Sequence, residues 1–182
     1  MPGWQQFYKE NHNESFELIS VAIDVQGAGR PLHYVNEACA KFPTLLDKSN
    51  MLGRLLGFRM VPNGFLVDED GVLRYREIGK FNIESPATRK MLIRWAQGSD
   101  INPDNVLNTR EFHQMLPEVR HMFERGLELY EIGMPHQSID IWKKALELDP
   151  DNYIVRKQIW AVENPEKFYS GKIDTDWQKT RR

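Results

Sequence analysis

The sequence predicts an α/β domain followed by an all-helical region. Three observations support this fold class. Strand and helix patterns alternate through residues 1–97, and every pattern from residue 109 onward is helical. Residues 98–108, which separate the two, are rich in turn-forming residues and lack periodicity. We therefore expect a first domain over residues 1–97, a linker over 98–108 and a helical region over 109–182.

Composition limits the classes of function. The 182 residues carry 24 Lys and Arg against 26 Asp and Glu, a formal net charge of -2. A chain without an excess of one charge lacks the electric field that holds nucleic acid or an anionic membrane, so we expect neither as a partner. Residues 1–30 show no signal peptide, and no apolar run reaches the roughly 18 residues of a membrane segment. The compartment stays open.

The first domain opens with a helix and a strand. Trp4, Phe7 and Tyr8 recur at helical spacing behind Pro2, which predicts an amphipathic helix. Residues 16–25 form an almost continuous apolar run with β-branched residues. Such a run is typical of a strand that is buried on both faces.

Two helices flank a short extended segment in the middle of this domain. Residues 31–41 predict a helix, residues 42–47 the extended segment, and residues 50–56 a helix that stops at Gly57. The first of these helices has one apolar side, which we expect to be buried. That side carries Leu32, Val35, Ala38 and Cys39.

A hairpin and a helix complete the first domain. Residues 65–67 and 72–76 are two short strands around an Asp-Gly turn. The acidic residues 68–71 of that turn lack the loop length and the distal Glu of a calcium loop, so we interpret them as a turn. Ser85 as N-cap and Pro86 at the first position start the closing helix.

Three of these segments together resemble the thioredoxin-like fold, in its redoxin branch of peroxiredoxin-related thiol-disulfide oxidoreductases. They are FELISVAIDV at residues 16–25, FPTLLD at 42–47 and VPNGFLVDEDGVLRYREIG at 61–79. The resemblance covers roughly residues 1–97. It implies a sheet flanked by helices, thiol–disulfide exchange or peroxide reduction, and a protein partner or protein disulfide as substrate. We expect no cofactor, and the five histidines show no metal-ligand spacing.

The resemblance also implies where substrate binds. In the family, a cis proline ahead of the second hairpin faces the reactive cysteines and presents backbone to an extended substrate. By that match Val61, Pro62 and Asn63 would bind substrate or partner, although Asn63 departs from the threonine common after that proline. Without the resemblance, a trans Pro62 that merely starts a strand is the simpler interpretation.

The reactive pair of the family, Cys-x-x-Cys, is absent, so no catalytic residue is assigned. The pair precedes the first helix, which here starts at about Pro2. The resemblance implies that the central strand and the opening hairpin are missing too, which leaves a gap of roughly 10 Å between the strands at 16–25 and 64–67. We expect an inactive, N-terminally truncated copy in which Met1 is internal. It would be unstable, or oligomeric through its open sheet edges, unless another strand fills the gap.

Cys39, the single cysteine, has two interpretations. Its neighbours offer no base and one cation, and its position is mid-helix, which favours a buried and inert thiol. The alternative is a lone peroxide-sensing thiol. Neither allows an internal disulfide or a dithiol redox couple.

The helical region contains one segment, residues 119–152, that resembles a tetratricopeptide repeat. Its matches are Gly126, Gly133, Trp142, Ala145 and the closing Leu-Asp-Pro-Asp-Asn. Residues 153–162 predict the next helix. One repeat cannot bury its own apolar faces, so we expect it to dock on the first domain, with binding to a separate partner as the alternative. In that alternative the whole chain is a non-catalytic protein-interaction module.

Overall fold

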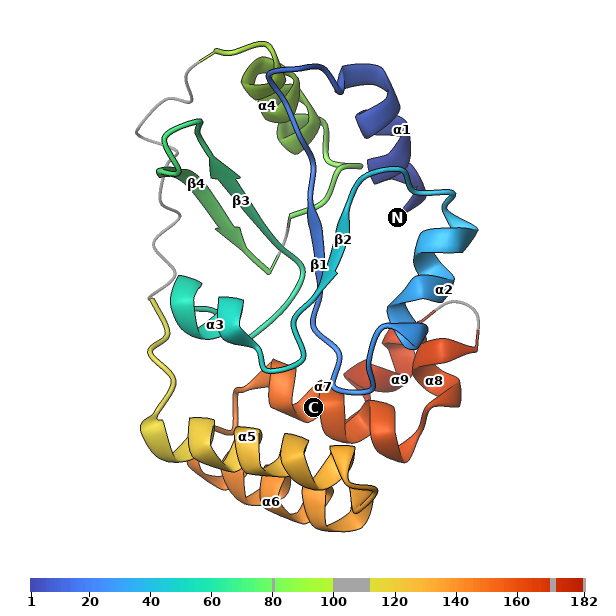
Figure 1. The fold of residues 1–182 in the computed structure, drawn as a ribbon, viewed down its shortest axis with the longest axis vertical. Coiled ribbons are helices and arrows are strands. Elements are labelled where there is room, and N and C mark those ends of the chain that lie inside the picture. Colours follow the sequence, from blue (N-terminus) through green and yellow to red (C-terminus); the bar gives the residue numbers. More distant parts are fainter. Residues whose placement is uncertain (80, 100–111, 171–172, 182) are drawn as a thin grey trace.

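The structure, a computed structural model, describes residues 1–79, 81–99, 112–170 and 173–181. It confirms a mixed α/β part that is followed by helices (Figure 1). Most of the expected linker over residues 98–108 lies outside the described residues.

Helices and strands of the α/β part follow the expected order. They are α1 (Pro2–Asn11), β1 (Ser20–Ala22), α2 (Gly29–Glu37), β2 (Thr44–Leu46), α3 (Met51–Leu56), β3 (Asn63–Val67), β4 (Leu73–Ile78) and α4 (Pro86–Ala96). Local capping sets several ends. The Asp47 carboxylate accepts hydrogen bonds from the first amides of α3, both at 2.8 Å, and Gly57 ends that helix in the left-handed conformation. The Ser85 hydroxyl caps α4 as predicted.

The strands of the described residues form two separate two-stranded sheets. β1 and β2 are parallel, with Ser20 opposite Thr44, whereas β3 and β4 form an antiparallel hairpin. Gly71 provides the positive φ, 79°, that the hairpin turn requires. In Figure 1 the hairpin lies on one side of β1 and β2 on the other, and β3 runs opposite in direction to β1.

Hydrophobic clusters on both faces hold the two sheets together. Leu18, just before β1, packs in one cluster with Leu66 of β3, and that cluster includes residues of α1 and α4. Ile23, just after β1, packs in another cluster with Phe65. Because successive side chains of a strand point to opposite faces, Leu66 and Phe65 place these clusters on opposite faces of the layer. β1 and β3 are therefore neighbours without being hydrogen-bonded to each other.

The helical region starts after the undescribed segment. Its helices are α5 (Pro117–Glu131), α6 (Pro135–Leu148), α7 (Tyr153–Glu163), α8 (Glu166–Tyr169) and α9 (Thr175–Lys179). α5 and α6 pack around Trp142, which is 0% exposed and donates from Nε1 to the Phe123 carbonyl at 3.1 Å. A Cβ on Gly126 would lie 2.1 Å from Trp142 Nε1, so this close approach requires glycine.

The helical region docks on the α/β part, as expected. Val25, which follows β1, is 1% exposed and packs in the core of α5, α6 and α7 with Val119 and Ile159. The end of the chain packs as well, because the Trp177 ring contacts the ring of Trp160 at 5.7 Å.

Three expectations for the first domain are wrong. β1 covers Ser20–Ala22 rather than residues 16–25, and Ile19 is 54% exposed, so this strand is not buried on both faces. Among the described residues β1 is hydrogen-bonded to one strand, β2, and this single partner limits both the length and the burial of β1. No residue of α2 is buried, and Leu32 is half exposed. A sheet of only two strands offers a helix little apolar surface to cover.

Cys39 is the third of these corrections. It lies beyond the end of α2 with φ 48°, and its side chain is exposed. The helix ends at Glu37, so Cys39 is neither mid-helix nor buried. In the helical region, Ile132 and Leu148 are exposed because they lie at the ends of α5 and α6.

Candidate functional site

One edge of β1 has no strand partner among the described residues. The Ser20 amide donates to the Pro43 carbonyl at 2.9 Å, and the Ala22 carbonyl accepts from the Asp47 amide at 2.8 Å. Backbone groups of successive strand residues point in opposite directions, so those of Ile19 and Val21 point away from β2. We call this side the inner edge of β1.

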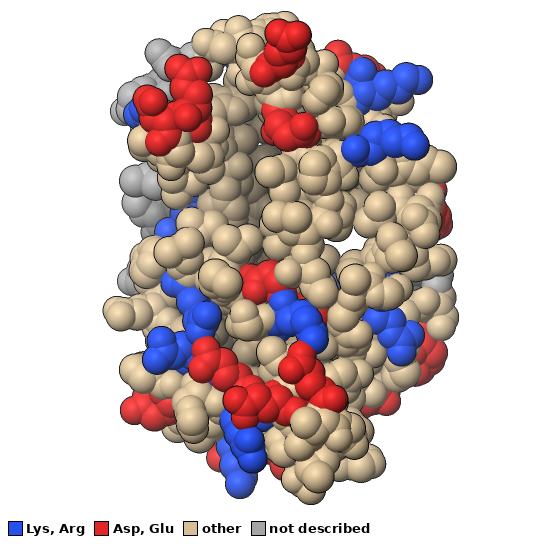
Figure 2. Space-filling model, in the orientation of Figure 1, with Lys and Arg blue, Asp and Glu red and all other residues tan. Residues whose placement is uncertain are grey.

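β3 has an equivalent edge. The Pro62 carbonyl accepts from the Gly79 amide at 2.9 Å, and Gly64 pairs with Glu77 across the hairpin. By the same alternation, the backbone groups of Asn63, Phe65 and Val67 point away from β4. They form the inner edge of β3, on the side of β1 in Figure 1. Figure 2 shows a surface that is recessed between the hairpin and β1.

The turn predicted to border the site lies at the start of β3. The Val61–Pro62 peptide bond is cis, as the resemblance implied, and both residues are exposed. Asn63 instead supports the turn: Nδ2 donates to the Met60 carbonyl at 2.6 Å, and Oδ1 accepts from the Gly79 amide at 3.0 Å. Of the predicted binding residues, Val61 and Pro62 are accessible and the Asn63 side chain is committed to the fold.

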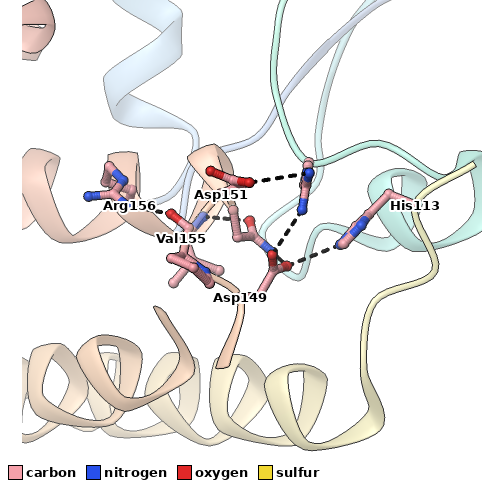
Figure 3. Close-up of polar contacts among 8 residues, drawn as sticks. His113, Asp149, Asp151, Val155 and Arg156 are labelled. Carbon is pink, nitrogen blue, oxygen red and sulfur yellow. Dashed lines mark hydrogen bonds and ion pairs between the residues drawn. The ribbon is translucent and has the colours of Figure 1, made fainter. Parts of the chain in front are cut away.

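A polar junction anchors this turn to the helical region (Figure 3). Asp149, which is buried after α6, accepts a hydrogen bond at 3.2 Å from Nη1 of Arg59, just ahead of the turn. The other oxygen of Asp149 contacts His113 Nε2 and Asn152 Nδ2, both at 3.0 Å. The Arg59 carbonyl accepts from the Ile154 amide, in the first turn of α7, at 3.2 Å. The segment before Val61 is thereby fixed from both its side chain and its backbone.

A second contact reaches the inner edge of β1 itself. Gln158 of α7 is 5% exposed. Its Nε2 donates to the Ile23 carbonyl at 3.2 Å, and its Oε1 accepts from the Val25 amide at 3.1 Å. In a parallel sheet, a neighbouring strand engages this carbonyl and this amide with the N–H and the C=O of one residue. The Gln158 side-chain amide therefore makes the two hydrogen bonds that one residue of a neighbouring parallel strand would make.

Asp24 forms a further link between β1 and the helices. Its buried carboxylate accepts from the Tyr169 hydroxyl at 2.7 Å and from the Gln26 amide at 2.8 Å. Burial raises the pKa of Asp24, and burial together with that carboxylate raises the pKa of Tyr169. Arg30 lies over the Tyr169 ring at 4.7 Å. The group joins the end of β1 to α8.

Thiol chemistry at this site is limited by the residues present. Cys39 is the single cysteine, and thiol–disulfide exchange in a dithiol enzyme needs two. The described residues contain no group of three or more His, Cys, Asp and Glu side chains placed to hold a metal ion. Across the described residues, no helix has the length and apolar character that a membrane crossing requires.

Comparison of this chain with family models, with curated proteins and with solved structures finds no match. Charge does not identify a partner either, because acidic and basic side chains are interspersed on the face in Figure 2. The function is therefore argued from the motifs and from the inner edges.

Proposed function

We propose that this chain is the scaffold of a thioredoxin-like redoxin protein, related to peroxiredoxins and thiol-disulfide oxidoreductases. On this proposal, residues 1–182 do not turn over disulfides by themselves. One observation carries it: a parallel β1–α2–β2 unit and an antiparallel β3–β4 hairpin are neighbours, and their inner edges have no strand partner within the described part of the chain. The resemblance implies this arrangement for a redoxin sheet that lacks its central strand.

The Val61–Pro62 turn would take the substrate. β3 runs opposite to β1 and begins at the turn, so the turn lies near the end of the layer where β1 finishes. A strand placed between the inner edges and parallel to β1 would also finish there. Reactive thiols that follow such a strand would face the exposed backbone of Val61 and Pro62, as in the family that the motifs resemble.

The reaction is thiol–disulfide exchange. One thiolate attacks a substrate sulfur, the substrate disulfide breaks, and a mixed disulfide forms. A second thiol then attacks the mixed disulfide and releases the reduced substrate, which leaves the protein with a disulfide. Both thiols must come from outside the set of residues 1–182, because Cys39 supplies only one and lies beyond α2.

The test supplies the missing parts. A strand followed by Trp-Cys-x-x-Cys is fused ahead of Met1, and a matched fusion carries Ser-x-x-Ser. We expect reduction of insulin disulfides by the first fusion only, and by neither the Ser control nor the unfused chain. Pro62→Ala in the active fusion lowers turnover, whereas Cys39→Ser leaves it unchanged.

Two outcomes contradict the proposal. One is dithiol turnover by the unfused chain. The other is a Cys fusion that unfolds cooperatively, and so is folded, but is no more active than its Ser control.

A second candidate, the non-catalytic interaction module, is favoured by one observation. Val21 and Leu45 pair across β1 and β2 and remain exposed, at 37% and 54%, as does Ile19. Binding through this face would be lost in Leu45→Lys. Trp142 is unsuited to such a test, because it is fully buried and its removal acts on folding.

A further inference from the structure

We propose that the inner edge of β1 binds one short extended segment of a second polypeptide, and that Gln158 sets where this segment stops. This inference deepens the proposed function. It rests on the proposed function in one respect, because both require that the inner edge of β1 is open. It assigns that edge a partner of defined chemistry and gives the helical region a part in selecting it.

The edge has an open half and a closed half. The backbone groups of Ile19 and Val21 face away from β2, and β1 pairs with no other strand of the described residues. Two residues on, the Gln158 amide already holds the Ile23 carbonyl and the Val25 amide. A bound strand therefore pairs at Ile19 and Val21, and it cannot continue past Ile23 without displacing Gln158.

The clusters around the edge define the side chains of the bound segment. Leu18 and Leu66 belong to the apolar cluster on one face of the layer, and Ile23 and Phe65 to the cluster on the other. Alternate side chains of a strand between β1 and β3 would enter these two clusters in turn. The partner is thus an extended segment with consecutive apolar residues, because a buried charge without a partner is costly.

The chemistry of Gln158 supports this assignment. Most of α7 that faces the core is apolar, including Val155 and Ile159. A glutamine amide offers one acceptor and two donors on a planar group, the same kinds of groups that a peptide unit offers. Here Nε2 meets a carbonyl and Oε1 meets an amide, so both ends of the side chain are used as a strand would use them. The proposed strand site is continuous with this contact between α7 and β1.

In the experiment a peptide without a thiol is added to the full chain. Because the peptide cannot exchange disulfides, the experiment measures strand binding and not turnover. The probe is a capped peptide of about six residues, with Val and Ile at the centre and Lys at both ends. Amide hydrogen exchange is followed residue by residue. We expect protection of the Val21 amide to rise at least about tenfold at saturation, a change of about 1.4 kcal/mol. The amides of Ser20 and Val25, which already have partners, should not change. A control peptide with proline at alternate positions lacks the donors and should protect nothing.

The role of Gln158 in stopping the bound segment is tested by varying the length of the peptide. In the unaltered chain, a peptide two residues longer should bind no more tightly than the shorter one. In Gln158→Leu, which keeps the bulk and removes both hydrogen bonds, the Val25 amide should lose protection in the free chain. In this variant the longer peptide should restore the protection of the Val25 amide. If Gln158→Leu does not fold, the length series in the unaltered chain still decides.

Three results would overturn the proposal. The first is a Val21 amide that stays unprotected at saturating peptide. The second is a longer peptide that binds the unaltered chain more tightly in proportion to its length. The third is protection of Val21 that depends on chain concentration rather than on peptide, which assigns the edge to a second copy of this chain.

Discussion

The helical region and the α/β part differ in how far each completes its own hydrogen bonds and core. In the helical region Val119, Trp142 and Val155 are each 0% exposed. In the α/β part Ile19 and Leu45 are each 54% exposed, although Ile19 belongs to a segment predicted to be buried on both faces. A helix satisfies its backbone within itself, whereas a strand depends on its neighbours. The two short sheets of the α/β part therefore leave apolar side chains exposed, whereas the paired helices bury theirs.

The two regions are complementary where they meet. Val25, the residue of the β1 segment with the least exposure, is buried in the core of the helices rather than in the sheet. Gln158 and Asp149 supply hydrogen bonds to backbone and side chains of the α/β part. The helical region thus stabilises the β1–β2 sheet from one end and leaves the inner edge of β1 open at the other, among the residues that the structure describes.

The largest effect that separates the regions is expected at Trp142. Trp142→Ala removes a fully buried ring and its hydrogen bond to the Phe123 carbonyl. We expect the free energy of unfolding to fall by about 3–5 kcal/mol, measured by urea titration. The same change at Trp4, a partly buried tryptophan of the α/β part, should cost below about 3 kcal/mol. Equal losses would contradict the difference between the two cores.

The junction between the regions should give the next largest effect. Asp149→Ala leaves Arg59, His113 and Asn152 without their shared acceptor. We expect a loss of about 1–3 kcal/mol in the free energy of unfolding. The matched control is Asp151→Ala, whose side chain is 80% exposed and 3.6 Å from Arg59, and which should change stability by less than about 0.5 kcal/mol. A control that costs as much as Asp149→Ala would show that the junction is not anchored by the buried carboxylate.

The β1–β2 sheet should tolerate change at its exposed face. Leu45→Ala is expected to alter the free energy of unfolding by less than about 0.5–1 kcal/mol, because the side chain is already half exposed. Leu92→Ala, a change of the same type in the buried cluster of the α/β part, should cost about 2–5 kcal/mol. A large loss at Leu45 would mean that this face is covered in solution.

Asp24 should give the smallest effect, and it depends on pH. Burial raises the pKa of Asp24 in the folded chain above its usual value, so the folded state holds the proton more tightly than the unfolded state. The resulting stability is fully present below the unfolded pKa and is lost as pH rises through the raised folded value. Asp24→Asn should remove this acid-side dependence and keep an acceptor for the Tyr169 hydroxyl. Urea titrations across that pH window, with the exposed Asp140→Asn as control, would detect it. An unchanged profile would contradict the burial of this carboxylate.

Sequence patterns predicted the elements that depend on local signals. The Ser85 cap, the Gly57 stop and the hairpin turn each follow from residue type and spacing. The exposure of Cys39 was not predictable in this way, because α2 ends earlier than its periodicity suggests.

The docking of the helical region was predicted, but the residues that make the contacts between the two regions were not. Polar residues on a helix are normally interpreted as facing solvent, so the pattern of α7 gave no sign that Gln158 is buried against a strand. Arg59 and Asp149 likewise lie far apart in sequence, and their pairing depends on how the helices dock. In the candidate site, the resemblance predicted the cis Val61–Pro62 bond, for which residue types alone favoured a trans bond, and neither predicted the structural role of Asn63.

The claim on which the account depends is that the inner edge of β1 is unpaired in this chain. Residue-resolved hydrogen exchange on the chain alone, at low concentration, tests it with two adjacent amides. The Ser20 amide donates to the Pro43 carbonyl and should be protected, whereas the Val21 amide points to the inner edge and should exchange near its intrinsic rate. Equal protection of Ser20 and Val21 would contradict the account, because it would mean that a strand already occupies the edge.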